Sequence, residues 1–179
     1  MELLRHAVML LSFSLFIITC SLIAVSAQDD NDSVPPPVKV ISKEDRAKLD
    51  AVADLKVRTK LAVDMLKLRV DAVEKLGAKE DFDGVFSELG KFRGLLDYTI
   101  GYLQKQDAKQ NKTLDNYKRL ELFLRSAAPR LEVIRRDLPL RYDEYVREFQ
   151  IYIRDARRKV IEPLFGDTVL PTESVNGKQ

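Results

Sequence analysis

Residues 141–161 read RYDEYVREFQIYIRDARRKVI and carry the clearest helical pattern in the chain. Apolar and aromatic side chains recur there at intervals of three and four, which places them on one side of a helix with about 3.6 residues per turn. They are Tyr142, Tyr145, Val146, Phe149, Tyr152, Ile153, Ala156 and Val160. Arg147, Arg154 and Arg158 fall on the opposite side. Because such a helix is not stable alone in water, the pattern predicts packing against other helices.

Three further segments of the chain have the same periodicity. We therefore predict helices over residues 43–76, 79–110, 114–137 and 140–165. The composition agrees, because 32% charged residues, seven Gly and no Trp suit long amphipathic helices better than a β-sandwich or barrel. Short connections favour antiparallel packing of consecutive helices. The predicted fold class is all-α, an elongated up-down-up-down four-helix bundle.

Capping residues and prolines set the expected helix boundaries. Ser42 begins a capping-box pattern, and Gly77 follows the first periodic run as a stop signal. Pro129 lies inside the third run and predicts a kink or, if it breaks the helix, a count of five helices. Pro139 should force Leu138 out of helical geometry and so separate the last two helices.

The N-terminal segment resembles a secretory signal peptide. Arg5 and His6 precede an apolar run, and the small side chains at Val25 and Ala27 resemble a cleavage site. The mature chain would then begin at Gln28, in the periplasm or outside the cell. This segment predicts export.

Two alternatives for this segment stay open. The apolar run is about long enough to span a bilayer, so residues 7–25 could remain as an anchor. Residues 17–20, IITC, loosely resemble a lipoprotein cleavage motif, which would place a lipid on Cys20. Membrane contact is expected only through this segment, if it is uncleaved or lipidated.

The composition divides the chain into four parts. We predict a signal peptide over 1–27, an acidic, Pro-rich and solvated linker over 28–41, a helical bundle domain over 42–166 and a flexible tail over 167–179. No internal repeat is apparent.

Cleavage after Ala27 would restrict the chemistry open to the protein. It would remove the only Cys and the only His, and with them zinc sites of the Cys and His type and catalytic arrangements built on Cys or His. A formal net charge of +2 does not indicate a nucleic-acid binder. We therefore predict a protein that is not an enzyme, has no cofactor or metal and binds no nucleic acid.

Small residues on the second predicted helix suggest an interaction surface. Gly94 and Gly101 are seven residues apart and Gly90 lies close by, on the side opposite the apolar stripe. Each helical Gly costs about 1 kcal/mol relative to Ala, so this row suggests the close approach of a second surface, such as another copy. The exposed row Arg147, Arg154 and Arg158 is the second candidate interaction surface.

Tyrosines suggest a different site. Tyr98, Tyr102, Tyr142, Tyr145 and Tyr152 lie at the edges of the second and fourth stripes. They could line an aromatic groove for an apolar ligand, or simply bury their rings and leave their hydroxyls in water.

The sequence therefore predicts an exported, non-enzymatic helical bundle that acts as an interaction or scaffold module of the bacterial cell envelope, through a protein partner or self-association. A carrier of a small apolar ligand in an inter-helical groove is the alternative.

Overall fold

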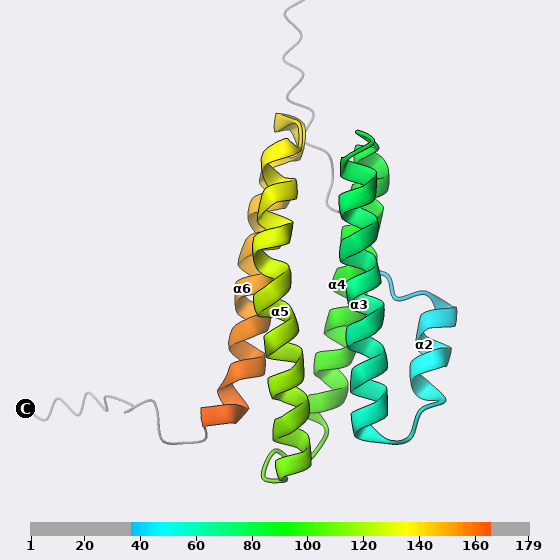
Figure 1. The fold of residues 1–179 in the computed structure, drawn as a ribbon, viewed down its shortest axis with the longest axis vertical. Helices are drawn as coiled ribbons and strands as arrows, with labels where there is room; N and C mark the ends of the chain where they lie inside the picture. The colour runs from blue at the N-terminus through cyan, green and yellow to red at the C-terminus, as the bar shows by residue number, and fades with distance from the viewer. Residues whose placement is uncertain (1–36, 166–179) are drawn as a thin grey trace, which may run out of the picture. The chain divides into compact units, whose positions relative to one another are not determined.

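The computed structural model describes residues 37–165, which form five α-helices, one short 3-10 helix and no strand (Figure 1). The elements are α2 (Lys43–Asp50), α3 (Leu55–Gly77), α4 (Phe82–Gln104), α5 (Asn111–Asp137), η1 (Leu140–Tyr142) and α6 (Asp143–Phe165). The all-α prediction with four long helices is confirmed. The predicted signal peptide, residues 28–36 of the linker, and residues 166–179 lie outside the described residues.

The four long helices alternate in direction, but they do not all pack in chain order. α3 packs along both α4 and α5, and α6 packs along α5, whereas α4 and α5 meet only briefly (Figure 1). The expectation that consecutive helices are neighbours therefore holds for α3 with α4 and for α5 with α6. It is wrong for α4 with α5, because α5 lies beside the parallel helix α3 instead.

An ion-pair cluster joins the parallel helices α3 and α5. Arg130 of α5 donates from Nε to Glu74 Oε1 at 2.6 Å and from a terminal nitrogen to Asp71 Oδ1 at 2.6 Å. The hydrogen bond from Arg130 holds the pKa of Glu74 below its ordinary value.

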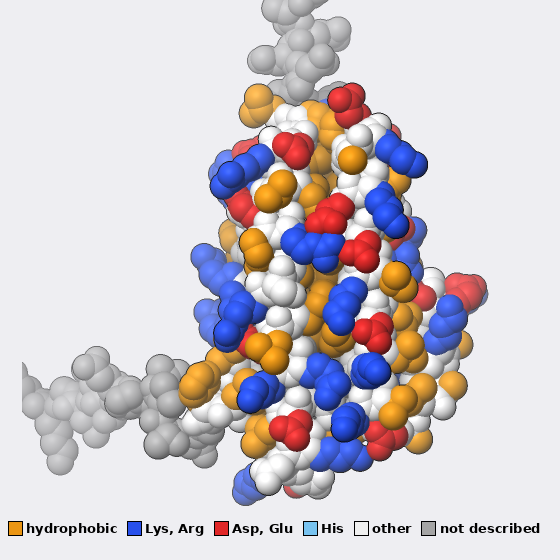
Figure 2. Space-filling model, viewed as in Figure 1, with side chains coloured by type: hydrophobic (Ala, Val, Ile, Leu, Met, Phe, Trp, Pro, Cys, Tyr) orange, Lys and Arg blue, Asp and Glu red, His pale blue; other side chains and the backbone are white. Residues whose placement is uncertain are grey.

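Basic and acidic side chains are mixed over the face of the molecule shown in Figure 2, and neither sign of charge dominates that face.

Aromatic side chains fill the space between α4 and the η1–α6 segment. The Phe86 ring lies 5.2 Å from that of Tyr142 and 4.2 Å from that of Tyr145, and the Phe92 ring lies 6.0 Å from that of Phe149. Rings of this size hold two helix backbones apart, which explains why α4 and α6 approach closely at few points.

The stripe predicted from residues 141–161 is confirmed. Tyr152 is half-buried and the other members are buried, while the three arginines opposite them are exposed.

The first predicted helix, 43–76, is wrong as a single element, because the chain leaves helical geometry between α2 and α3. Asp54 caps the new helix, with Oδ1 accepting from the Val57 amide at 2.9 Å. A carboxylate that satisfies a free amide at a helix start favours a second helix over continuation of the first. The predicted cap at Ser42 is confirmed, since its hydroxyl oxygen accepts from the Asp45 amide at 3.0 Å.

α4 is shorter than the predicted 79–110 at both ends. At its start, Asp81 Oδ1 accepts from the Gly84 amide at 2.9 Å and so fixes the first turn. Beyond its end, Asp107 Oδ1 accepts from the Lys109 amide at 3.0 Å, a local turn that competes with helix. α5 then begins at Asn111, three residues before the predicted start.

The prolines behave differently from each other. Pro129 lies inside a continuous α5, so the five-helix alternative caused by a break there is wrong. Leu138 has an extended backbone with ψ of 140° directly before Pro139, as predicted.

A partly buried ion-pair network attaches α2 to α3 and α4. Arg69 donates to Asp45 at 2.7 Å and to Glu88 at 3.0 Å, and Lys91 donates to Glu88 at 2.7 Å. Burial raises the pKa of Glu88, but the hydrogen bonds from Lys91 and Arg69 outweigh it and hold the pKa below the ordinary value of 4.5.

This network predicts a specific loss of stability in acid. The unfolded chain binds a proton on Glu88 at a higher pH than the folded chain does. The ionised Glu88 therefore stabilises the fold above about pH 4.5, and this stabilisation is lost as the pH falls through the folded-state pKa. In urea unfolding at a series of pH values, the Glu88→Gln variant should therefore be less stable than the native protein at neutral pH. It should also lose less stability than the native protein as the solution is made acidic. The exposed Glu148→Gln is the control, and identical acid losses in both variants would contradict the prediction.

Candidate functional site

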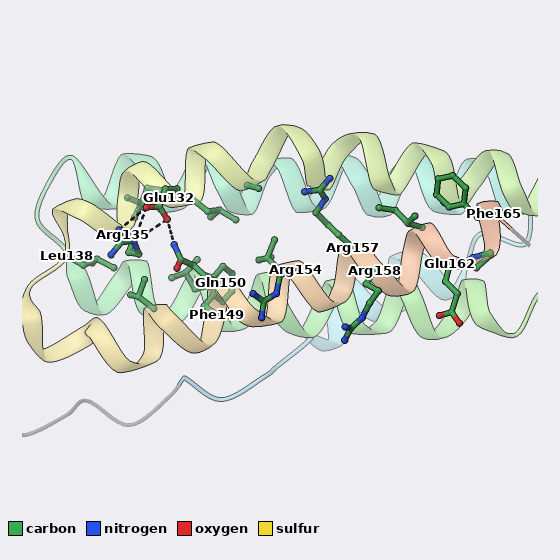
Figure 3. Close-up of a pocket in the computed structure, with 18 of the residues that line it drawn as sticks. Glu132, Arg135, Leu138, Phe149, Gln150, Arg154, Arg157, Arg158, Glu162 and Phe165 are labelled. Carbon is green, nitrogen blue, oxygen red and sulfur yellow. Dashed lines mark hydrogen bonds and ion pairs between the residues drawn. The ribbon is translucent and has the colours of Figure 1, made fainter. Parts of the chain in front are cut away.

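A groove of about 1450 Å³ runs between α5 and α6 (Figure 3). Its floor is apolar, with Leu131 and Ile134 from α5, Phe149 and Ile153 from α6, and Leu89 from α4. Leu138 lies near one end and Phe165 near the other, where Ala108 and Lys109 of the α4–α5 loop also line it. The groove therefore extends along most of α6.

The rim of the groove is predominantly basic. Its charged residues are Lys109, Arg135, Arg154, Arg157 and Arg158 on the positive side, and Glu132 and Glu162 on the negative side. Arg157 and Arg158 follow Arg154 by three and four residues, so all three lie on one side of α6. This arrangement can accept an apolar surface flanked by negative charge.

Internal hydrogen bonds occupy the charges near the Leu138 end. Arg135 donates from Nε and a terminal nitrogen to Glu132 Oε1 at 3.0 and 2.8 Å, and the Gln150 amide also donates to Glu132 (Figure 3). The hydrogen bond from Arg135 lowers the pKa of Glu132, which therefore stays ionised at neutral pH. This end presents little unpaired charge.

The three arginines of α6 that line the groove differ in how firmly other side chains hold them. Arg157 donates to Glu121 Oε1 at 3.2 Å, and Glu121 is only 4% exposed, so this arginine is anchored. Arg158 pairs with Asp155 at 3.1 Å on the open surface, where such pairs are weak. Arg154 has no acidic partner within 4 Å among residues 37–165. Within the described part of the chain, Arg154 and Arg158 are thus the α6 arginines of the groove without a buried acidic partner.

The structure places the predicted glycine row partly beneath the chain's own linker. A Cβ on Gly94 would lie 2.8 Å from the Val40 carbonyl oxygen, and one on Gly90 would lie 2.8 Å from that of Val38. Lys39 also pairs with Asp97 of α4 at 2.7 Å. Residues 37–41, predicted as solvated linker, thus pack on α4 and fill the space above these two glycines, which is not free for a second copy.

Gly101 differs from the other two glycines, since a Cβ there would meet nothing within 4 Å. Arg147 is exposed, pairs with Asp143 at 2.8 Å and does not line the groove. Of the predicted interaction residues, only Arg154 and Arg158 belong to the groove.

Tyr98 and Tyr102 lie on the side of α4 that faces α2 and α3. The Tyr98 hydroxyl donates to Asp50 and accepts from Arg58 at 3.1 Å. The Arg58 guanidinium lies 3.9 Å from the centroid of the Tyr102 ring, a cation–π contact. These two tyrosines therefore hold α2 and the start of α3 against α4.

The other three predicted tyrosines lie between α4 and α6. Tyr142 and Tyr145 pack on Phe86, and the Tyr152 hydroxyl donates to Asp97 Oδ1 at 2.8 Å. Burial raises the pKa of Tyr145 and of Tyr152, so both hydroxyls stay protonated at neutral pH. The five tyrosines do not come together in one aromatic groove.

Within residues 37–165, no group of three or more His, Cys, Asp or Glu side chains is placed to hold a metal ion. In the same range, no helix combines the length and the apolar character that a membrane crossing needs.

The chain matches no protein-family model, and comparisons with curated proteins and with solved structures likewise give no match.

Proposed function

We propose that this protein is an exported, non-enzymatic interaction module of the bacterial cell envelope and that it binds its partner in the α5–α6 groove. The export part of the proposal rests on the resemblance of residues 1–27 to a signal peptide. The binding part rests on one observation, the apolar floor bordered by a basic rim.

The position of the floor in the fold supports a binding role. Phe149 is 4% exposed and Ile153 is 6% exposed, so both are held by the core that they share with α4. A floor fixed in this way needs no ordering when a partner binds, which reduces the entropic cost of association. Apolar area covered on binding contributes about 25 cal/mol per Å² before such costs.

A carrier of a small apolar ligand is the second candidate, because the same floor would accept one. The volume of about 1450 Å³ exceeds the range of about 300–1,000 Å³ that is usual for small-molecule sites. The groove is also only partly enclosed. Both features favour a larger partner over an enclosed small molecule.

Titration with anilinonaphthalene sulfonate, an apolar dye with one negative charge, tests the groove. We expect saturable binding that raises the melting temperature. Leu131→Ser should weaken binding roughly tenfold, because removing an apolar contact of this size costs at least about 1.4 kcal/mol.

Val133→Ser is the matched control, since Val133 is 59% exposed on the same helix and does not line the groove. Thermal unfolding of both variants checks that each remains folded. If the native protein binds no dye, or if the two variants bind it equally well, the groove is not the binding site.

A further inference from the structure

We infer that the partner held in the groove is an amphipathic helix of another protein, with acidic residues along one flank. This inference rests on the proposed function, because it names the partner of the same groove. Three properties of the groove carry it: its length, its volume and the charge of its rim.

The length and volume fit a helix. Val146 and Phe165 both line the groove and are 19 positions apart on α6, which corresponds to about 28 Å at 1.5 Å per residue. A helix about 10 Å wide and of that length, embedded to half its depth, displaces about 1,100 Å³. The groove holds about 1450 Å³, so it has room for about five turns of such a helix.

The rim charge fits an acidic flank. Arg154 has no acidic partner among the described residues, and Arg158 has only the exposed Asp155. An arginine guanidinium pairs with a carboxylate through two parallel hydrogen bonds. Arg157 and Arg158 lie three and four residues after Arg154, so glutamates spaced three or four apart on a bound helix would meet this side of α6.

The apolar floor of the groove would contact the apolar side of the bound helix. Leu131 and Ile161 are half-buried and Phe165 is exposed, and they give the groove an accessible apolar surface against which a helix would place residues at intervals of three and four. A basic amphipathic helix could make the same apolar contacts, but its charges would be repelled by the arginines of the rim. The sign of the flanking charge therefore distinguishes the inferred partner from other amphipathic helices.

Two synthetic peptides of 20 residues test this inference with the purified protein. Both carry the same leucine stripe, and one has glutamates on its flanks where the other has lysines. In fluorescence anisotropy, we expect the glutamate peptide to bind at least about tenfold more tightly than the lysine peptide. Arg154→Glu should weaken binding of the glutamate peptide by a similar factor.

Lys159→Glu is the matched control, because Lys159 is also exposed on α6 but does not line the groove. It reverses the same charge and should change the affinity less than about twofold, as rim charges outside a contact do. Equal effects of the two variants would mean that the charge of the whole protein, not Arg154, attracts the peptide, and would overturn the inference.

Other occupants give different results. Equal affinity for both peptides would overturn the inference that the partner helix has an acidic flank. Binding of palmitate without binding of either peptide would overturn the helix and leave a groove for small amphiphiles. Self-association of the protein that Arg154→Glu abolishes would make the occupant a second copy, and would also overturn the inference. The proposed function is tested separately by the dye titration, and it can hold even if neither peptide binds.

Discussion

Replacing Leu66 with alanine is expected to lower the free energy of unfolding by about 3 kcal/mol, whereas Leu68→Ala should lower it by less than about 1 kcal/mol. The two leucines are two residues apart on α3 and lose the same atoms. Leu66 is 0% exposed in the core, and Leu68 is 66% exposed on the outer face. Only the first substitution leaves a cavity among packed side chains, which is the main cause of the difference.

Urea unfolding of the two variants and the native protein measures this difference. The m-value should stay constant, because both substitutions leave the extent of the fold unchanged. Similar small losses at the two positions would contradict the packing of α3 described above.

Gly94→Ala and Gly101→Ala are expected to change the protein in opposite directions. Alanine exceeds glycine in helix propensity by about 1 kcal/mol, so Gly101→Ala, with no atom within 4 Å of the new Cβ, should stabilise the protein by about that amount. At Gly94 the new Cβ would lie 2.6 Å from the Val40 carbonyl carbon and 2.8 Å from the Ile41 amide nitrogen. Because the opposing atoms are backbone, residues 37–41 must move away from α4.

Limited digestion with trypsin detects that movement, since Lys39 is a cleavage site in the displaced segment. We expect Gly94→Ala to accelerate cleavage after Lys39 and Gly101→Ala to leave it unchanged. If both variants are stabilised equally and are cleaved at the native rate, the glycine at position 94 does not serve to admit the linker.

The periodicity of the sequence was sufficient to predict the four long helices, because each buries one apolar side. It was not sufficient to predict the break before α3. Val52 and Leu55 continue the apolar spacing through the break, so the cap at Asp54 was the only local signal. The packing of α5 beside α3 depends on contacts between segments far apart in the chain, such as Arg130 with Glu74, which no local pattern contains.

The sequence indicated part of the candidate site and missed its main feature. The spacing of Arg154 and Arg158 placed them on one side of α6, and both line the groove. Ile153 was placed on the buried side of its helix, where the structure has it, but a periodic stripe identifies the apolar side of a helix without showing how much of it a neighbour covers. The unusual cost of Gly94 was noticed, but the chain's own linker explains it.

Isoleucine methyl NMR with the glutamate peptide tests the α5–α6 groove most directly. Ile134, Ile153 and Ile161 line the groove, whereas Ile100 and Ile151 do not, and Ile151 lies on the same helix as two of the first three. We expect the peptide to shift the signals of the three groove residues and to leave those of Ile100 and Ile151 in place. Shifts confined to Ile100 or Ile151, or no shift of any methyl signal at saturating peptide, would contradict the assignment of the groove as the binding site.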